Sequence, residues 1–193
     1  MKTTDGDQAA PGELELVRGF VNTRDVEDGT DELSDGASAA GWFTAHGVAV
    51  GAEPFSNAGL GRLIEVREAL RALLLTNNSG ETPDERALAV LNGESARTEI
   101  GLRFESGGSA LVTRCDGVDC AIARVLAITH DAMHDGIFKR LKVCPAEDCL
   151  WAFYDHSRNR SGTWCTMEVC GNRAKARAFR ERHKPRPSRE SRR

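Results

Sequence analysis

The sequence predicts an α+β fold: a mostly helical N-terminal domain with a small β-hairpin, followed by a small cysteine-rich C-terminal module with a basic helix. The length of 193 residues leaves room for one ordinary domain and a small appendage. The first 135 residues carry helical apolar spacing, and all six cysteines lie after residue 114. Apolar residues form 40% of the chain and charged residues 28%, which is typical of globular proteins and excludes the collagen-like, disordered and membrane classes. Because no apolar run suits a membrane span or a signal peptide, we expect a cytoplasmic protein.

Apolar periodicity predicts the first elements. Residues 14–23 have a mixed period and predict a short strand or helix. Residues 38–46 have a helical composition, and Gly47 is placed to end that helix. A long helix ending near Asn77 is predicted by apolar residues at helical spacings, namely Leu60, Leu63, Ile64, Leu70, Leu73 and Leu74.

Two further helices flank a predicted hairpin. Thr82 as the cap and Pro83 in the first turn predict the start of one helix. Residues 100–105 and 110–115 are alternating runs joined by a Ser-Gly-Gly-Ser linker, which predicts a β-hairpin. Residues 119–134 return to helical spacing, with one apolar side formed by Ile122, Val125, Leu126 and Met133.

The charge of the chain changes sign near Gly136. Residues 1–135 have a net charge of −12, and residues 136–193 have a net charge of +9. Such a basic end indicates a polyanionic partner, most commonly nucleic acid, although a merely solvating basic tail is the plainer alternative. Residues 185–193 hold two prolines among arginine and serine, which predicts a disordered basic tail.

The last four cysteines have the spacing C-x4-C-x15-C-x4-C, formed by Cys144, Cys149, Cys165 and Cys170. A frame of two disulfides would suit an exported protein, but paired cysteine knuckles in a reducing compartment more often hold a metal. Four thiolates satisfy the tetrahedral preference of Zn²⁺ and leave no position for a catalytic water. We therefore expect one structural zinc ion, around which six aromatic residues after Gly136 form core in preference to stacking on bases.

Two other groups could in principle bind a metal or react. Cys115 and Cys120 form a further C-x4-C pair, which we interpret as buried free thiols in preference to a second metal site. His130 and His134 lie at i and i+4 of a helix, as in a metalloprotease, but Asp131 replaces the usual glutamate and no third ligand is evident. We therefore expect the protein not to be an enzyme.

Residues 170–173, Cys-Gly-Asn-Arg, resemble the motif that names the CGNR zinc fingers, and residues 164–167 and 153–157 are similar to the same family. Residues 20–23, Phe-Val-Asn-Thr, resemble the entry motif of the ABATE domain, the usual partner of this finger. The resemblance implies a transcription regulator of the stress-induced type, with zinc bound by the four cysteines. It divides the chain into an ABATE-like sensor or ligand-binding domain (1–135), a CGNR finger (136–184) and the tail (185–193).

Nucleic-acid contacts are predicted on a helix that begins at the last knuckle. Arg173, Arg177, Arg180 and Lys184 would lie within about 60° of one another and form a basic ridge without an acid on it. Ala174, Ala178 and Phe179 lie off the ridge and would dock the helix on the finger. The remaining candidates for contacts are Lys175 on the helix and Arg158 and Arg160 in the loop between the knuckles.

Two smaller roles follow from the last knuckle. Gly171 is interpreted as a tight turn near the metal. Asn172 is interpreted as a side chain that shapes the turn, in preference to one that contacts an adenine.

Together these features predict a DNA-binding transcriptional regulator whose N-terminal domain senses a small-molecule effector or binds a protein partner. The alternative is an RNA-binding or protein-interaction zinc module. The sequence does not specify the DNA sequence recognised, the effector or the oligomeric state.

Overall fold

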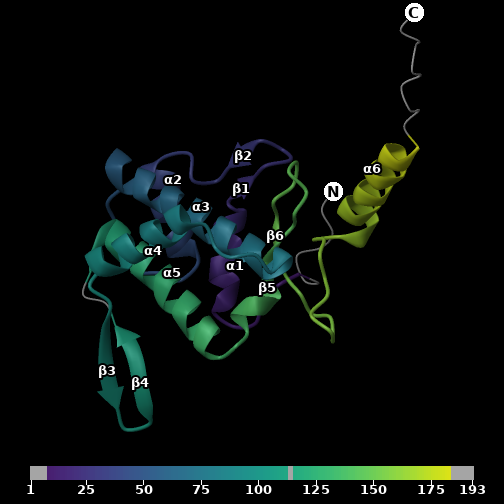
Figure 1. Cartoon of the computed structure of the whole chain (residues 1–193). Helices are drawn as coiled ribbons and strands as arrows, with labels where there is room; N and C mark the ends of the chain where they lie inside the picture. Colours follow the sequence, from purple (N-terminus) through teal and green to yellow (C-terminus); the bar gives the residue numbers. More distant parts are fainter. Residues whose placement is uncertain (1–7, 113–114, 184–193) are drawn as a thin grey trace, which may run out of the picture.

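The body of the molecule is a group of five helices with α3 at its centre. In the computed structural model, which describes residues 8–112 and 115–183, these helices are α1 (Leu14–Asn22), α2 (Gly36–Ala45), α3 (Asn57–Ser79), α4 (Glu85–Arg97) and α5 (Gly117–His134). The long helix α3 contacts each of the other four (Figure 1). For residues 14–23 the sequence predicted either a strand or a helix, and the structure shows the helix α1.

Side-chain caps begin four of these helices. Asp35, Ser56, Asp84 and Asp116 each accept a hydrogen bond from a backbone N–H of the first turn. The predicted cap of α4, Thr82, is wrong: the Asp84 carboxylate accepts from Arg86 N at 3.0 Å, which also places a negative charge at the positive end of the helix dipole. Helix α3 ends at Gly80, whose φ of 73° favours glycine.

The strands form three separate antiparallel pairs. These are β1 (Arg24–Asp25) with β2 (Thr30–Asp31), β3 (Gly101–Glu105) with β4 (Gly108–Val112), and β5 (Leu141–Val143) with β6 (Ala152–Tyr154). The predicted hairpin is confirmed as β3–β4, although its loop is shorter than expected because Glu105 pairs directly with Gly108.

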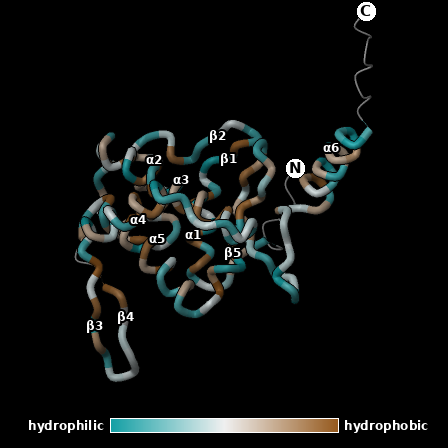
Figure 2. The backbone as a smooth tube through the Cα atoms, viewed as in Figure 1, coloured by the Kyte–Doolittle hydropathy of each residue, from teal (hydrophilic) through white to brown (hydrophobic). Residues whose placement is uncertain are grey.

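The β3–β4 hairpin projects away from the helices (Figure 1). In its register Leu102 pairs with Leu111 and Phe104 pairs with Ser109, so these side chains share one face of the ribbon. Figure 2 shows the apolar stretch along β3, where Leu102 is 64% exposed and Phe104 is 82% exposed.

One buried core joins the helices to the first part of the cysteine-rich segment. Phe20 and Phe43 lie in it together with the apolar stripe of α3. The same core contains Leu141, Val143 and Tyr154 of β5 and β6, and β5 packs directly on α3.

Two predictions for α5 and its surroundings are wrong. Met133 is 46% exposed, because the buried stripe of α5 is centred on Val125 and Ala132 and Met133 lies about 100° round the helix from Ala132.

Cys115 and Cys120 are not buried free thiols: both are half-buried, and they form a disulfide. Asp116, which follows Cys115, caps α5, and Cys120 lies in the first turn of that helix.

Candidate metal centre and nucleic-acid interface

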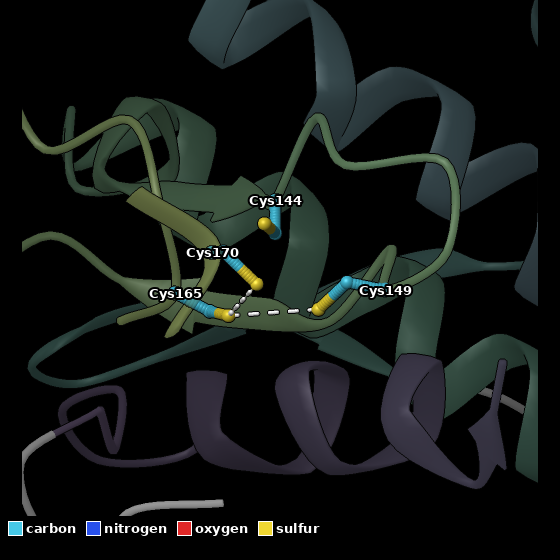
Figure 3. A group of neighbouring side chains, drawn as sticks. All are labelled: Cys144, Cys149, Cys165 and Cys170. Atoms are coloured by element: carbon cyan, nitrogen blue, oxygen red, sulfur yellow. Dashed lines mark hydrogen bonds between the residues drawn. The ribbon is translucent and has the colours of Figure 1, made fainter. Parts of the chain in front are cut away.

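The four predicted metal ligands converge on one point. Cys144 follows β5, Cys149 precedes β6, Cys165 lies in the next loop, and Cys170 lies in a single π-helical turn, Met167–Gly171. Their sulfur atoms all lie within 4.8 Å of one another, with Cys149 to Cys165 at 3.5 Å and Cys165 to Cys170 at 3.6 Å (Figure 3). Zn–S bonds of about 2.3 Å in a tetrahedron separate the sulfurs by about 3.8 Å, so the cluster has the size of a zinc site.

The pKa shifts of the cysteines show which of them would keep a proton when no cation is bound. Hydrogen bonds from Cys149 and Cys165 lower the pKa of the Cys144 thiol, whereas the hydrogen bonds that Cys165 makes with Cys144 and Cys149 raise the pKa of Cys165. Burial, together with the negative charge of Cys144 and Cys149, raises the pKa of Cys170 to about 12. Each thiolate disfavours ionisation of its neighbours, and a bound divalent cation would offset this repulsion and favour all four thiolates. The residues fit one structural zinc, held by Cys144, Cys149, Cys165 and Cys170.

Backbone hydrogen bonds shape the first knuckle, residues 144–149. Cys149 N donates to Ala146 O at 2.8 Å, and Cys144 N donates to Trp151 O at 2.9 Å. Leu150, the residue after the knuckle, has a φ of 50°, which is unusual for a residue with a side chain. Its carbonyl accepts a hydrogen bond from the Arg71 guanidinium at 2.7 Å, so helix α3 helps to hold this conformation.

The second knuckle, residues 165–170, is followed by Gly171 and Asn172. Gly171 ends the π-helical turn beside Cys170, where its N–H donates to Thr166 O at 3.1 Å, and its φ of −62° is right-handed. A Cβ at this position would overlap the sulfur of Met167, so a larger residue would displace that flexible, half-exposed side chain. Asn172 donates through Nδ2 to Glu168 O at 3.0 Å, in agreement with a role in the turn.

Most aromatic residues of this segment are core, as predicted. Phe153 is buried against the cysteine cluster, and Trp151 and Trp164 pack on it. Phe138, in a short 3₁₀ turn (Phe138–Arg140), and Tyr154 lie in the main core. The exception is Phe179, which is 57% exposed.

Polar side chains from the N-terminal half fasten the finger to the body, and sequence reasoning missed them. Asn22 donates to Ala152 O at 2.9 Å and accepts from Ala152 N at 2.7 Å, so its amide continues the ladder beside β6. Asn78 donates to the carbonyls of Val143 and Thr163. Asn22 belongs to the Phe-Val-Asn-Thr motif, and this motif was the one sequence feature that could have indicated a special role for Asn22.

A buried ion pair stabilises the loop between the knuckles. Lys142 Nζ lies 2.7 Å from Asp155 Oδ2 and also donates to the carbonyls of Arg160 and Gly162, so all three of its protons are used. Burial opposes the charge on Asp155, but hydrogen bonds from Lys142 and from the Ser157 and Gly162 amides outweigh it and lower the pKa to about 2. This pair was not predicted: Asp155 lies in residues 153–157, which resemble the family, but no sequence pattern indicates Lys142 as its partner.

The basic helix is α6 (Asn172–Arg182), which begins at the last knuckle as predicted and has no buried residue. It stands away from the helical body (Figure 1). Lys175 and Arg180 are exposed on it, and Arg158 and Arg160 are exposed in the loop between the knuckles. Lys184 and the tail 185–193 lie outside the described residues.

Arg173 and Arg177 are not free cations. The ridge has no acid of its own, but acidic residues from two other loops pair with these two arginines. Arg177 lies 2.9 Å from Asp148 in the first knuckle, and Arg173 lies 3.4 Å from the same carboxylate and also pairs with Glu27 of the β1–β2 loop. The prediction that Ala178 and Phe179 dock the helix is wrong, because both are exposed. The ion pairs of Arg173 and Arg177 connect this side of α6 to the finger, and Ala174, the third predicted docking residue, is half-buried beside Trp164.

The other candidate metal ligands stay apart from this centre. His130 is exposed and contacts Asp131 at 3.2 Å, and His134 is exposed. Within residues 8–112 and 115–183, the four cysteines are the one group of three or more side chains placed to hold a metal ion.

The fold and the site together define a helical domain joined to a four-cysteine zinc finger. Comparison with family models agrees: residues 140–183 match the CGNR zinc finger, and residues 14–133 match ABATE, described as "Putative stress-induced transcription regulator". Because the second match spans more than half of the chain, the protein belongs to the ABATE family, and it carries a CGNR zinc finger. None of the curated proteins matches the chain. No helix in the described part of the chain combines the length and apolar character needed to cross a bilayer.

Proposed function

We propose that this protein is a DNA-binding transcriptional regulator, in which the zinc finger presents α6 to duplex DNA. The observation that carries the proposal is the composition and exposure of α6. Its eleven residues include Glu181 as the one acid and five cations, Arg173, Lys175, Arg177, Arg180 and Arg182, and none of its side chains is buried. A helix that stabilises no core but concentrates positive charge is suited to a polyanion.

The dimensions of α6 also suit DNA. Eleven residues at 1.5 Å each give a helix about 16 Å long, and the major groove of B-DNA, about 12 Å wide, admits an α-helix. The zinc cluster lies at the N-terminal end of α6 and fixes the direction in which the helix leaves the finger.

The N-terminal domain has the sensing or pairing role in this proposal. Its net charge of −12 makes it unsuited to contact DNA itself, and a small-molecule effector or a protein partner would bind there. Because Asn22 and Arg71 connect this domain to the finger through hydrogen bonds, a change in the helices would reach the zinc module directly. The proposal assigns no catalytic activity to the chain.

The test is selection from random DNA duplexes, followed by salt titration with the selected duplex, a random duplex and a structured RNA. We expect salt-sensitive binding to duplexes, with a preference for the selected sequence that persists at physiological salt. Arg180→Ala should weaken binding, whereas Arg86→Ala, which removes an exposed cation from α4 on the opposite half of the protein, should not. Equal binding to random and selected duplexes, or preferred binding to RNA, would contradict the proposal.

A further inference from the structure

The two sides of α6 differ in how their charges are compensated. On one side, Arg173 and Arg177 pair with the carboxylates of Asp148 and Glu27, so two positive charges face two negative charges. A phosphate that approaches this side meets both carboxylates. The ion pairs therefore compensate the part of the ridge formed by Arg173 and Arg177 and reduce its attraction for DNA.

The opposite side of α6 carries a different set of residues, Lys175, Phe179 and Arg182, which we call the outer strip. At about 100° per residue, Lys175 and Arg182 lie within about 20° of each other, and Phe179 lies about 40° from Lys175. Phe179 is about 160° round the helix from Arg177. The outer strip therefore points away from Asp148, and the structure shows no acidic partner for Lys175 or Arg182 among the described residues.

The central residue of the outer strip is a large apolar side chain in an unusual position. Phe179 is 57% exposed, although the helix around it is strongly polar. Its ring stacks on His183, with centroids 4.0 Å apart and an interplanar angle of 26°, which restricts the orientation of the ring. An oriented aromatic ring flanked by cations suits a ligand that has an apolar surface between anionic groups.

We infer that α6 contacts duplex DNA through the outer strip, with Phe179 at the base edges and with Lys175 and Arg182 on the phosphates. This inference rests on the proposed function and specifies which side of the helix performs it. In the major groove, the apolar group available to a phenylalanine is the C5-methyl group of thymine. Lysine and arginine contacts to phosphate fix the position of the helix without reading sequence.

Arg173 and Arg177 are then positioning residues. Asp148 lies between the zinc ligands Cys144 and Cys149, so its ion pairs connect the first knuckle to the first two turns of α6. They hold the helix at a fixed angle to the zinc cluster while the outer strip remains accessible. Loss of one arginine should alter this angle but should remove no phosphate contact.

The experiment compares single variants of the full, zinc-loaded chain on the selected duplex and on a random duplex. Lys175→Ala and Arg182→Ala should weaken binding to both duplexes, and each should lower the salt slope by about one. Phe179→Ala should weaken binding to the selected duplex roughly tenfold and change binding to the random duplex little. Arg177→Ala, a change of charge of the same size on the other side of the helix, should leave the salt slope unchanged.

A second measurement isolates the base contact. Replacing single thymines by deoxyuridine in the selected duplex removes one methyl group at a time. One such replacement should weaken binding of the wild type and have no effect on Phe179→Ala. Zinc content and circular dichroism should match the wild type for every variant, because the substituted side chains are exposed.

The outcomes separate the inference from the proposed function. If Arg177→Ala lowers the salt slope while Lys175→Ala and Arg182→Ala do not, the ridge contacts the phosphates and the inference is wrong, although the protein still binds DNA. If no deoxyuridine replacement distinguishes the wild type from Phe179→Ala, the assignment of Phe179 to a base is wrong. If the wild type shows no salt-sensitive binding to duplexes, the proposed function itself fails.

Discussion

Substitution of Asn22 by alanine tests whether the N-terminal domain and the finger share one cooperative structure. The Asn22 side chain is the partner of both backbone groups of Ala152, at 2.7 and 2.9 Å, and Ala152 is fully buried. In Asn22→Ala, one N–H and one C=O lose their partners where water cannot replace them. An unsatisfied buried polar group costs about 1–3 kcal/mol, so with two such groups we expect the free energy of unfolding to fall by about 2–6 kcal/mol.

The assay is urea denaturation of the zinc-loaded protein, followed by circular dichroism and by tryptophan fluorescence. The transition midpoint should fall while its slope stays constant, and both signals should change together. Asn172→Ala is the matched control, because it removes the same side chain from an exposed site with one hydrogen bond to Glu168, and it should cost less than about 1 kcal/mol. Equal losses in the two variants would refute the reasoning.

Three further predictions concern the metal, the pH and the disulfide. Metal analysis should find one zinc per chain, and a chelator should remove hydrogen-exchange protection from residues 165–182 while β5 and β6, which belong to the main core, stay protected. The free energy of unfolding should fall by about 2.5 kcal/mol as the pH drops from about 5 to 1, because Asp155, whose pKa is lowered to about 2, stabilises the fold only while its carboxylate is ionised; Asp155→Asn should lack this part of the slope. Alkylation of the unfolded, metal-free chain without a reductant should label four cysteines, and six after reduction, whereas six before reduction would contradict the Cys115–Cys120 disulfide.

Much of the helical body could be predicted because local signals and tertiary structure agree. The apolar stripe of α3 and the linker of the β3–β4 hairpin each specify their element without reference to the rest of the chain. The zinc ligands were predictable for the same reason, since spacing alone brings two knuckles of two cysteines together. Residues 14–23 were ambiguous because their apolar positions fit both the helical and the strand period. In the structure they form a helix whose apolar side packs against α3 and α5.

Features that depend on partners distant in sequence could not be predicted. Arg177 was expected to be a free cation, and its neighbour Asp148 lies in another loop, 29 residues away. The same holds for Asn22, whose partner Ala152 is 130 residues away. The disulfide was missed for another reason: the expected compartment and the apolar register of Cys120 favoured a buried thiol, and neither reveals the turn at the start of α5.

The polar contacts between the first helix and the finger have a consequence for biosynthesis. Helix α1 leaves the ribosome before the finger exists, so the Asn22 amide and the apolar surface that will cover β5 and β6 remain without their native partners until about 130 further residues have been made. The nascent N-terminal domain therefore exposes an apolar, incompletely hydrogen-bonded face during this interval. Closure of this face coincides with completion of the first zinc knuckle, so the N-terminal domain acquires its complete core only after β5 and β6 have been made.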